Sequence, residues 1–510
     1  MRPILFLLCS LVAAAAAPPN LVYILADDLG YGDVRCLNPQ GKIATPQMDR
    51  LRAQGMSFGD AHAGSAVCTP TRYGVLTGRY AWRSRLQQGV LGGMSPPLIE
   101  PGRLTVASFL QAEGYVTACI GKWHLGLGWV RLGSAGAFAD GIEPGAKGWE
   151  ADFRKPFGGG PLALGFGQFF GIAASLDMAP YTYLEGDRVA RLPEVEKTFP
   201  MVEGKAGGAT RRGPAAADFE AGEVLGALTA RAEAFIKAQS AARPFFLYLP
   251  LTAPHTPILP SAEWRGRSGL NAYADFVMET DAAVGRLLEA VDGAGLGGQT
   301  VFIVTSDNGC SPQADLGALR AAGHQVSGGF RGAKADLFEG GHRVPFLVRW
   351  PGRVAPGSSS EAPICLTDLL ATCAGWLGKA LPPEAGEDSV SLLPQLEQRP
   401  EAPPRPPVVH HSINGSFALR EGDWKLLLAA DSGGWSAPTP GSAAARGLPA
   451  VQLYNLAADP AEAHNAAAAH PEIAARLRAR LEQLVGDGRS TPGPPQANAV
   501  AVSLERKAPP

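Results

Sequence analysis

Apolar runs alternate with segments of helical periodicity as far as about residue 378, and this alternation constrains the fold more than any other feature of the chain. The apolar runs predict buried strands at residues 21–26, 115–120, 245–249, 300–305 and 345–349. The periodic segments predict helices at residues 46–54, 105–113, 219–239, 271–291 and 366–377. Such alternation is typical of parallel strands joined by crossover helices. We therefore predict an α/β fold, with a large, mostly parallel mixed sheet covered by helices on both faces.

One long segment interrupts this pattern. Residues 126–214 are rich in Gly and Pro, show no clear periodicity, and are too numerous for an ordinary connection between two elements. Insertions of this kind usually shape substrate pockets. We expect this one to border the functional site.

A proline-rich stretch, residues 399–407, separates a second region from the first. Proline lacks the amide donor and fixes φ, so this stretch continues neither a helix nor a central strand. After it come short strand-like pieces and a helical pattern, at residues 417–420, 424–428, 452–455 and 472–485. We predict a large domain at 18–398 and a small antiparallel sheet closed by a helix at 408–487. The tail, 488–510, is rich in Pro, Gly, Ala and Ser, and this composition predicts disorder.

The N-terminus has the features of a secretory signal peptide. Residues 1–17 contain one Arg, an apolar run and a string of alanines that ends before Pro18. We place cleavage between Ala15 and Ala17, which predicts a secreted or periplasmic protein. No other stretch reaches the roughly 18 continuous apolar residues that a membrane helix needs.

Charge and cysteine content exclude several classes of protein. The chain has 45 Lys and Arg against 47 Asp and Glu, so no basic excess points to nucleic acid, and any anion must bind at a local cluster. Beyond Cys9, the cysteines are widely spaced and do not form the framework of a disulfide-rich domain. They are Cys36, Cys68, Cys119, Cys310, Cys365 and Cys373. We interpret all of them except Cys68 as small core residues.

Cys68 opens the strongest local motif, Cys68-Thr69-Pro70-Thr71-Arg72, which is followed by Leu76-Thr77-Gly78-Arg79. Pro70 suits the first turn of a helix, which would place residue 68 at the positive end of that helix, where an oxyanion is stabilised. Arg72 lies one turn further on and can face the same point. If this motif stood alone, a buried cysteine before an ordinary helix would be the better interpretation.

Two acidic pairs follow predicted strands. Asp27 and Asp28 come directly after strand 21–26, and Asp307 and Asn308 follow strand 300–305. An isolated Asp pair in such a place is more often a cap or a turn. However, an open α/β sheet places ligand-binding groups at the carboxyl ends of its strands. Three carboxylates and an amide oxygen form a hard site that suits Ca²⁺, with Mg²⁺ as the alternative.

Three further clusters contain cations and proton carriers. They are Gly121-Lys122-Trp123-His124-Leu125-Gly126, Ala253-Pro254-His255-Thr256-Pro257, and the segment from Arg331-Gly332-Ala333-Lys334 to Glu339-Gly340-Gly341. Any one Lys or His among them would by default be a solvated or hydrogen-bonded bystander. The three clusters are informative because they occur together.

These blocks, in this order, resemble the formylglycine-dependent sulfatases from about Asn20 to Trp350, with Thr71 where the family usually has Ser. The segment from Leu453 to Pro460 is similar to the family's closing subdomain. The resemblance implies that a formylglycine-generating or anaerobic sulfatase-maturating enzyme converts Cys68 to formylglycine. It also implies one calcium ion that contacts position 68. The implied metal ligands are Asp27, Asp28, Asp307, Asn308 and the modified Cys68.

The same resemblance implies a role for each cationic residue. A sulfate monoester is a poor electrophile, so its site needs a metal and several cations. Arg72, Lys122 and Lys334 would supply the cations. His255, with Lys334 nearby, would donate a proton to the leaving oxygen, and His124 would act as the base that regenerates the aldehyde.

Two other functions remain open at this point. A phosphomonoesterase or phosphonate monoester hydrolase shares the metal site, although the Lys122 and His255 blocks favour sulfate. A non-catalytic protein that binds sulfated glycans would belong to a different class. The segments 31–46 and 66–73 resemble bacterial sulfatases of the galactosamine-6-sulfatase and arylsulfatase A branch. We therefore expect 6-O-sulfated galactose or N-acetylgalactosamine units of polysaccharides, or an aryl sulfate, as the substrate.

Overall fold

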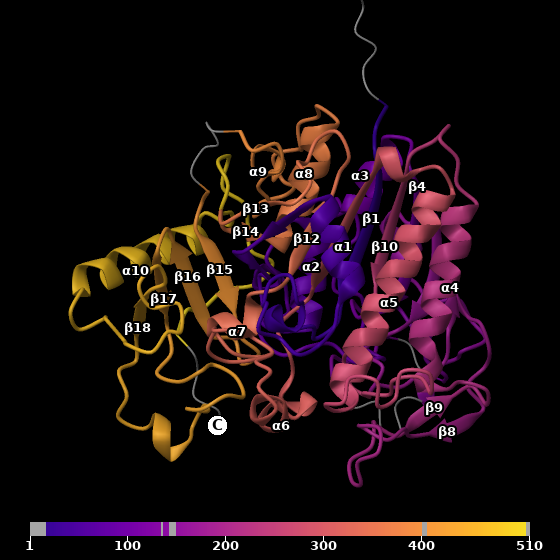
Figure 1. Cartoon of the computed structure of the whole chain (residues 1–510), viewed down its shortest axis with the longest axis horizontal. Coiled ribbons are helices and arrows are strands. Elements are labelled where there is room, and N and C mark those ends of the chain that lie inside the picture. Colours follow the sequence, from indigo (N-terminus) through magenta and orange to yellow (C-terminus); the bar gives the residue numbers. More distant parts are fainter. Residues whose placement is uncertain (1–16, 134–135, 142–148, 400–404, 506–510) are drawn as a thin grey trace, which may run out of the picture.

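The computed structural model describes residues 17–133, 136–141, 149–399 and 405–505 (Figure 1). Its main element is a ten-stranded sheet in the order β13-β2-β12-β11-β1-β10-β4-β5-β6-β7. The strands are β1 (Asn20–Ala26), β2 (Met56–Phe58), β4 (Val116–Lys122), β5 (Gln168–Ile172), β6 (Leu184–Glu185), β7 (Arg188–Val189), β10 (Phe245–Pro250), β11 (Thr300–Ser306), β12 (Phe346–Arg349) and β13 (Ser358–Ser360). The five central strands from β11 to β5 are parallel, and β12 is antiparallel to β11. The predicted mixed, mostly parallel sheet is confirmed.

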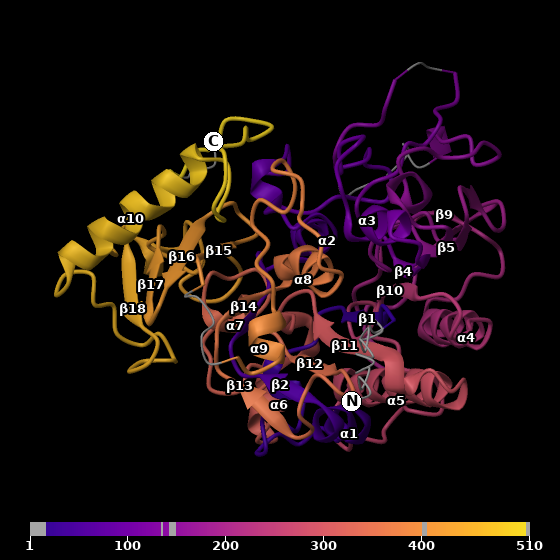
Figure 2. The same cartoon turned by 90° about the horizontal axis from the view of Figure 1, so that it is seen from above.

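Helices cover both faces of this sheet (Figure 2). They include α1 (Pro46–Gln54), α2 (Cys68–Thr77), α3 (Val106–Ala112), α4 (Val224–Lys237), α5 (Ala272–Gly293) and α8 (Leu369–Trp376). Successive side chains of a strand point to opposite faces, and β1 shows the result. Tyr23 and Leu25 join the core with α2, α3 and α8, whereas Val22 and Ile24 join the core with α1, α4 and α5. Both sets are fully buried, as expected for a parallel sheet covered on two sides.

Strand β5 was not predicted, although it lies inside the main sheet. It belongs to the Gly- and Pro-rich segment 126–214, which also contains β6, β7 and β8 (Val195–Lys197) and ends within β9 (Gly213–Ala215). Gly171 lies within β5, and a Cβ atom added there would lie 1.8 Å from the carbonyl oxygen of Gly121 on β4. The glycine that argues against a strand in the sequence is therefore required for close packing of two strands.

The C-terminal region forms a four-stranded antiparallel sheet, seen at the left of Figure 1 beside the large domain. It contains β15 (Val408–His411), β16 (Phe417–Glu421), β17 (Trp424–Leu427) and β18 (Gln452–Asn455), covered by α10 (Pro471–Gly486). Leu477 and Leu481 of α10 pack in one core with Leu419, Leu426 and Leu453 of the sheet. The predicted sheet with a terminal helix is confirmed. Most of the predicted linker, and residues 1–16 of the predicted signal peptide, lie outside the described residues.

Five further short α-helices and strands occur in the described residues, besides several 3-10 turns. They are β3 (Ala61–His62), β14 (Ile364–Cys365), α6 (Leu316–Ala321), α7 (Glu339–His342) and α9 (Leu393–Leu396). Strands β3 and β14 pair with each other in parallel. Helix α7 follows the loop that carries Lys334.

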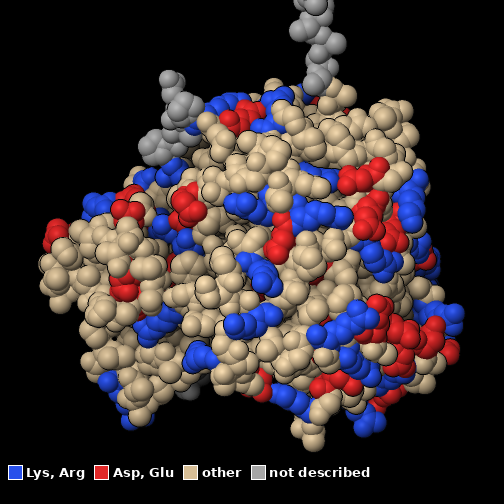
Figure 3. Space-filling view, viewed as in Figure 1, with Lys and Arg blue, Asp and Glu red and all other residues tan. Residues whose placement is uncertain are grey.

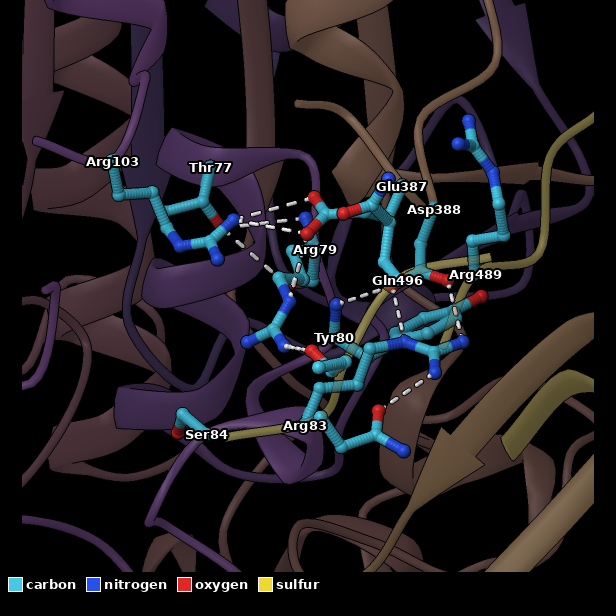
Figure 4. A network of polar contacts seen from close by, with 12 residues as sticks. Thr77, Arg79, Tyr80, Arg83, Ser84, Arg103, Glu387, Asp388, Arg489 and Gln496 are labelled. Carbon is cyan, nitrogen blue, oxygen red and sulfur yellow. Dashed lines mark hydrogen bonds and ion pairs between the residues drawn. The ribbon is translucent and has the colours of Figure 1, made fainter. Parts of the chain in front are cut away.

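The tail after Asp487, for which the composition predicts disorder, lies against buried arginines of the large domain (Figure 4). Arg83 donates to Oδ1 of Asn498 at 3.1 Å, and Arg79 donates to the carbonyl oxygen of Ala497 at 3.1 Å. Ser490 donates to Asp388 at 2.7 Å. Backbone carbonyls and short polar side chains make these contacts, so no apolar periodicity in the sequence announces them.

The face of the protein drawn in Figure 3 shows no dominant charge. On the face in Figure 3, side chains of both signs are interspersed, most densely over the region of α4, α5 and β8. In the part of the chain that the structure covers, no helix is long and apolar enough to cross a membrane.

Candidate active site

The carboxyl ends of four parallel strands bring the predicted site residues together. Asp27 and Asp28 follow β1, Lys122 ends β4, His255 follows β10, and Asp307 follows β11. These strands are neighbours in the order β11-β1-β10-β4, so their ends lie side by side. Asn308 lies next to Asp307, and His124 lies two residues beyond Lys122. Cys68 begins α2, and Lys334 lies in the loop before α7.

The acidic residues and Asn308 form the centre of this site. Nδ2 of Asn308 donates to Oδ1 of Asp28 at 2.7 Å, and the backbone N–H of Asp28 donates to Oδ1 of Asp307 at 3.3 Å. Oδ1 of Asp27 and Oδ1 of Asn308 are buried and have no hydrogen-bond partner among the described residues. Buried acceptor oxygens without donors are costly unless a cation binds them. These oxygens fit a hard divalent cation, which Asp27, Asp28, Asp307 and Asn308 could hold.

Each carboxylate also has its own cationic partner. Lys122 Nζ lies 2.6 Å from Oδ2 of Asp27, and Lys334 Nζ lies 2.7 Å from Oδ1 of Asp28. Arg72 donates to Oδ2 of Asp307 from Nε at 3.0 Å and from Nη2 at 2.7 Å. The three acidic and three cationic side chains balance in charge. A divalent cation would therefore leave the site two charges positive, which favours an anionic substrate.

Burial and these partners shift the titration of the carboxylates. Burial, and then the charge of Asp27, raises the pKa of Asp307 to about 7. Burial acts in the same direction on Asp27, but Lys122, His255 and Arg72 outweigh it and hold the pKa of Asp27 well below its usual value. Asp27 thus stays ionised more readily than Asp307.

Cys68 is 3 % exposed and is the first residue of α2, after the extended Val67. The positive end of the helix lies at this position, as predicted. Burial raises the pKa of the Cys68 thiol by more than Lys122 and Lys334 lower it. An unmodified Cys68 is therefore a protonated thiol at neutral pH and a weak nucleophile.

The two histidines of the site differ in their surroundings. Nε2 of His255 lies 3.7 Å from Oδ2 of Asp28, and burial followed by Lys334 lowers the pKa of His255. His124 is fully buried, and its Nε2 lies 2.7 Å from the carbonyl oxygen of Leu91. A carbonyl oxygen only accepts, so Nε2 donates and Nδ1 keeps a lone pair that has no partner among the described residues. Burial and then Lys122 lower the pKa of His124 well below its usual value, which keeps the ring neutral.

A family profile described as Sulfatase matches residues 19–379 of the chain. The chain belongs to the sulfatase family. It is 32 % identical over 504 residues to an N-acetylgalactosamine-6-O-sulfatase of Bacteroides thetaiotaomicron, covering 91 % of this chain and 93 % of that protein. It is 34 % identical over 509 residues to human arylsulfatase A, covering 95 % and 91 %. The protein is thus a sulfuric ester hydrolase.

Solved structures agree with this assignment. A sulfatase solved in work on glycosaminoglycan metabolism by Bacteroides thetaiotaomicron superposes with a TM-score of 0.77 at 31 % identity, covering 92 % of this chain and 99 % of that one. A phosphonate monoester hydrolase of Agrobacterium radiobacter superposes with a TM-score of 0.57 at 19 % identity, covering 91 % and 95 %. The second likeness shows a shared fold alone.

The sulfatase site also contains a residue that the sequence did not single out. Ser175 lies in the loop after β5, where its Oγ is 3.1 Å from Nζ of Lys122 and 3.3 Å from Nδ1 of His255. The only signal for it was the general expectation that segment 126–214 borders the site. His255 and Lys334 are 7 % and 5 % exposed, whereas Asp27 and Lys122 are fully buried. The small solvent exposure of the sulfatase site is therefore on the side of His255 and Lys334.

A second buried polar cluster joins the large domain of the sulfatase to its C-terminal sheet. Lys425 Nζ lies 2.9 Å from Glu339, 2.8 Å from Glu462 and 3.0 Å from Nε2 of His342. The rings of His342 and His410 stack with their planes 10° apart and their centroids 3.7 Å apart. Lone pairs of parallel rings do not converge on one ion, so we interpret the cluster as a structural network rather than a metal site.

Proposed function

We propose that this sulfatase removes 6-O-sulfate from galactose or N-acetylgalactosamine units of sulfated polysaccharides, with a formylglycine at position 68 and one Ca²⁺. The observation that supports this most is the position of Cys68, at the start of α2 and facing three acid–cation pairs at the carboxyl ends of β1, β4 and β11. A hydrated formylglycine would supply the attacking hydroxyl, and Ca²⁺ would polarise the sulfate.

The cations of this chain would hold the sulfate during the reaction. Lys122 and Lys334 both act electrostatically on Cys68. Arg72 lies one turn beyond Cys68 on the same helix and is tied to Asp307. Their positive charge offsets the repulsion between the sulfate oxygens and a nucleophile. Burial makes this electrostatic contribution larger than it would be in water.

Proton transfer falls to the two histidines. His255 lies on the slightly exposed side of the site and would protonate the leaving alcohol. Lys334 lowers the pKa of His255, and a bound sulfate would offset that charge and favour the protonated ring. His124 would accept a proton at its free Nδ1 when the aldehyde is regenerated.

The substrate class rests on the relatives rather than on a bound ligand. The similar Bacteroides protein is named for N-acetylgalactosamine 6-O-sulfate, and the similar human protein is named as an aryl sulfatase. A purified enzyme should therefore release sulfate from 6-O-sulfated N-acetylgalactosamine or galactose much faster than from their 4-O-sulfated isomers. Faster release from the 4-O-sulfated isomers, or of phosphate from 4-nitrophenyl phosphate, would contradict the proposal.

Maturation and localisation complete the proposal. We infer that a formylglycine-generating or anaerobic maturating enzyme acts on the chain before it folds, because Cys68 is almost inaccessible in the folded protein. Residues 1–17 would direct the protein to the periplasm or out of the cell. Mass spectrometry of the tryptic peptide that contains residue 68 tests the maturation, because it detects the aldehyde. N-terminal sequencing of the exported protein tests the cleavage.

A further inference from the structure

The loop after β5 places an acidic residue beside the sulfate site. Asp177 lies two residues beyond Ser175, which contacts both Lys122 and His255. Asp177 is 7 % exposed, as is His255. His255 also has the largest electrostatic influence of any side chain on Asp177, ahead of Arg211. Asp177 is therefore near His255, on the side of the site that keeps some solvent exposure.

Several contacts hold this carboxylate in one position. Arg211 donates from Nη1 to Oδ2 of Asp177, and its backbone N–H donates to the carbonyl oxygen of Asp177 at 3.1 Å. The hydroxyl of Tyr181 donates to that same carbonyl oxygen at 3.2 Å. Burial alone would raise the pKa of Asp177, but His255 and Arg211 lower it, so the group is ionised. The carboxylate is thus fixed and negative before any substrate binds.

One oxygen of this fixed carboxylate lacks a donor. Oδ1 of Asp177 is buried and has no hydrogen-bond partner in the described part of the chain. An ionised oxygen in that state is costly unless a ligand supplies a donor. The sulfate group cannot do so, because two anions repel each other. A neutral donor, such as a hydroxyl of a sugar, would satisfy this oxygen without such repulsion.

We propose that Asp177 accepts a hydrogen bond from a hydroxyl group of the leaving saccharide, and that Arg211 positions Asp177 for this contact. The pair selects sugar sulfates over sulfate esters that lack a neighbouring hydroxyl. The inference rests on the proposed function, because it concerns the alcohol side of the same reaction. Asp177 touches the substrate in this view, whereas Arg211 is a positioning residue.

The experiment compares two substrates in Asp177→Asn and Asp177→Ala. Loss of a charged hydrogen bond typically lowers binding by roughly 10-fold to 100-fold. We expect kcat/KM for 6-O-sulfated N-acetylgalactosamine to fall by about that factor, mainly through KM. Activity on 4-nitrophenyl sulfate, which has no hydroxyl beside the sulfate, should stay within about 2-fold and thereby show that the fold is intact. The pH profile on the aryl sulfate should be unchanged.

Neighbouring arginines provide a matched control. Arg211→Lys should raise KM for the sugar sulfate, because the planar guanidinium fork is lost. Arg212→Ala should leave kcat/KM unchanged for both substrates, because Arg212 pairs with Glu196 and its side chain is 75 % exposed. Equal losses on both substrates in Asp177→Asn, or a shifted pH profile, would overturn the inference and assign Asp177 a structural or His255-tuning role.

Failure of the proposed function would look different. Wild-type enzyme that hydrolyses the aryl sulfate but no sugar sulfate would overturn the substrate class and this inference together. Wild-type and Asp177→Asn enzymes that hydrolyse the sugar sulfate equally well would overturn only the inference.

Discussion

Nη2 of Arg72 lies 2.7 Å from Oδ2 of Asp307, and neither side chain is exposed. This pair ties α2, which begins with Cys68, to the end of β11. The nucleophile position and a candidate metal ligand are therefore fixed to each other by one buried ion pair. Removing one partner of such a pair typically costs about 3–5 kcal/mol, because the other charge stays buried.

Arg72→Leu should consequently lose both activity and stability. We expect hydrolysis of any sulfate ester to fall below detection and the free energy of unfolding to drop by about 3 kcal/mol. Chemical denaturation followed by circular dichroism measures the second effect. Arg85→Leu is a control, because Arg85 pairs with Asp140 at the surface and should cost under about 1 kcal/mol. Similar stability of Arg72→Leu and wild type would contradict a buried pair.

Cys68→Ala should abolish turnover and leave the fold intact. In the proposed mechanism residue 68 reacts and does not support packing, and a buried cysteine replaced by alanine leaves only a small cavity. Cys68→Ser should also be inactive at steady state, because a sulfated serine has no second hydroxyl through which to release sulfate. Sulfate release and a melting curve check both variants. Substantial residual turnover in Cys68→Ala would rule out the proposed nucleophile.

Removal of divalent cations should abolish activity, and Ca²⁺ should restore it better than Zn²⁺, because Asp27, Asp28, Asp307 and Asn308 offer only oxygens. Calcium should also raise the melting temperature, since an ion that binds only the folded state stabilises it, by about 2.7 kcal/mol at one hundred times its Kd. Differential scanning fluorimetry measures this rise in melting temperature without an assay of activity. In Asp28→Ala, calcium should no longer raise the melting temperature. A stronger stabilisation by Zn²⁺ would argue against a hard-oxygen site.

The sequence predicted the site better than it predicted the surroundings of the site. Asp27 and Asp307 come directly after apolar strands, so the rule that parallel strands end at one edge was enough to bring them together. Ser175 and Asp177 follow β5, whose Gly171 is needed for contact with Gly121 and disguises the strand. No local pattern marks residues whose position depends on such a strand.

Long-range polar contacts are another feature that the sequence does not show. The tail after Asp487 was expected to be disordered because it is rich in Pro, Gly, Ala and Ser. Its contacts with Arg79 and Arg83 come largely from backbone carbonyls and short polar side chains, which any sequence can present. The segment from Cys68 to Arg79 thus has two functions. Its first half faces the site, and its last residue binds Glu387 at 3.0 Å, remote from the chemistry.

Stability should depend on pH through Glu462. Burial, and then the charge of Glu339, raises the pKa of Glu462 to about 7. A carboxyl with a raised pKa in the folded state contributes stability that is complete below its unfolded pKa of roughly 4.3 and is lost as the pH rises towards 7. Glu462→Gln should remove this dependence, so its stability relative to wild type should rise by up to about 3 kcal/mol between pH 5 and pH 7.5. Glu472→Gln is the control, because Glu472 is 71 % exposed.

Urea denaturation at several pH values measures this difference. A constant difference between wild type and Glu462→Gln across the range would show that Glu462 is ionised at all these pH values in the folded protein. In that case Lys425 would neutralise both Glu462 and Glu339, with which it forms contacts of 2.8 and 2.9 Å.

The proton donor can be tested through the leaving group. An activated phenol departs as a stable anion, whereas a sugar alcohol needs a proton as the S–O bond breaks. His255→Ala should therefore retain a larger share of its activity on nitrocatechol sulfate than on a sugar sulfate, and the loss should be in kcat. Lys122→Ala should lower the activity on both substrates more evenly, because Lys122 contributes charge rather than a proton.

This pattern also separates His255 from Asp177. Loss of a hydroxyl contact at Asp177 raises KM and leaves the pH profile on the aryl sulfate unchanged, whereas loss of the acid at His255 lowers kcat and removes the alkaline limb of the profile on the sugar sulfate. Equal proportional losses of kcat/KM on both substrates in His255→Ala would mean that His255 only binds the sulfate. The proton would then come from Lys334, whose Nζ lies 2.7 Å from Oδ1 of Asp28 on the same slightly exposed side of the site.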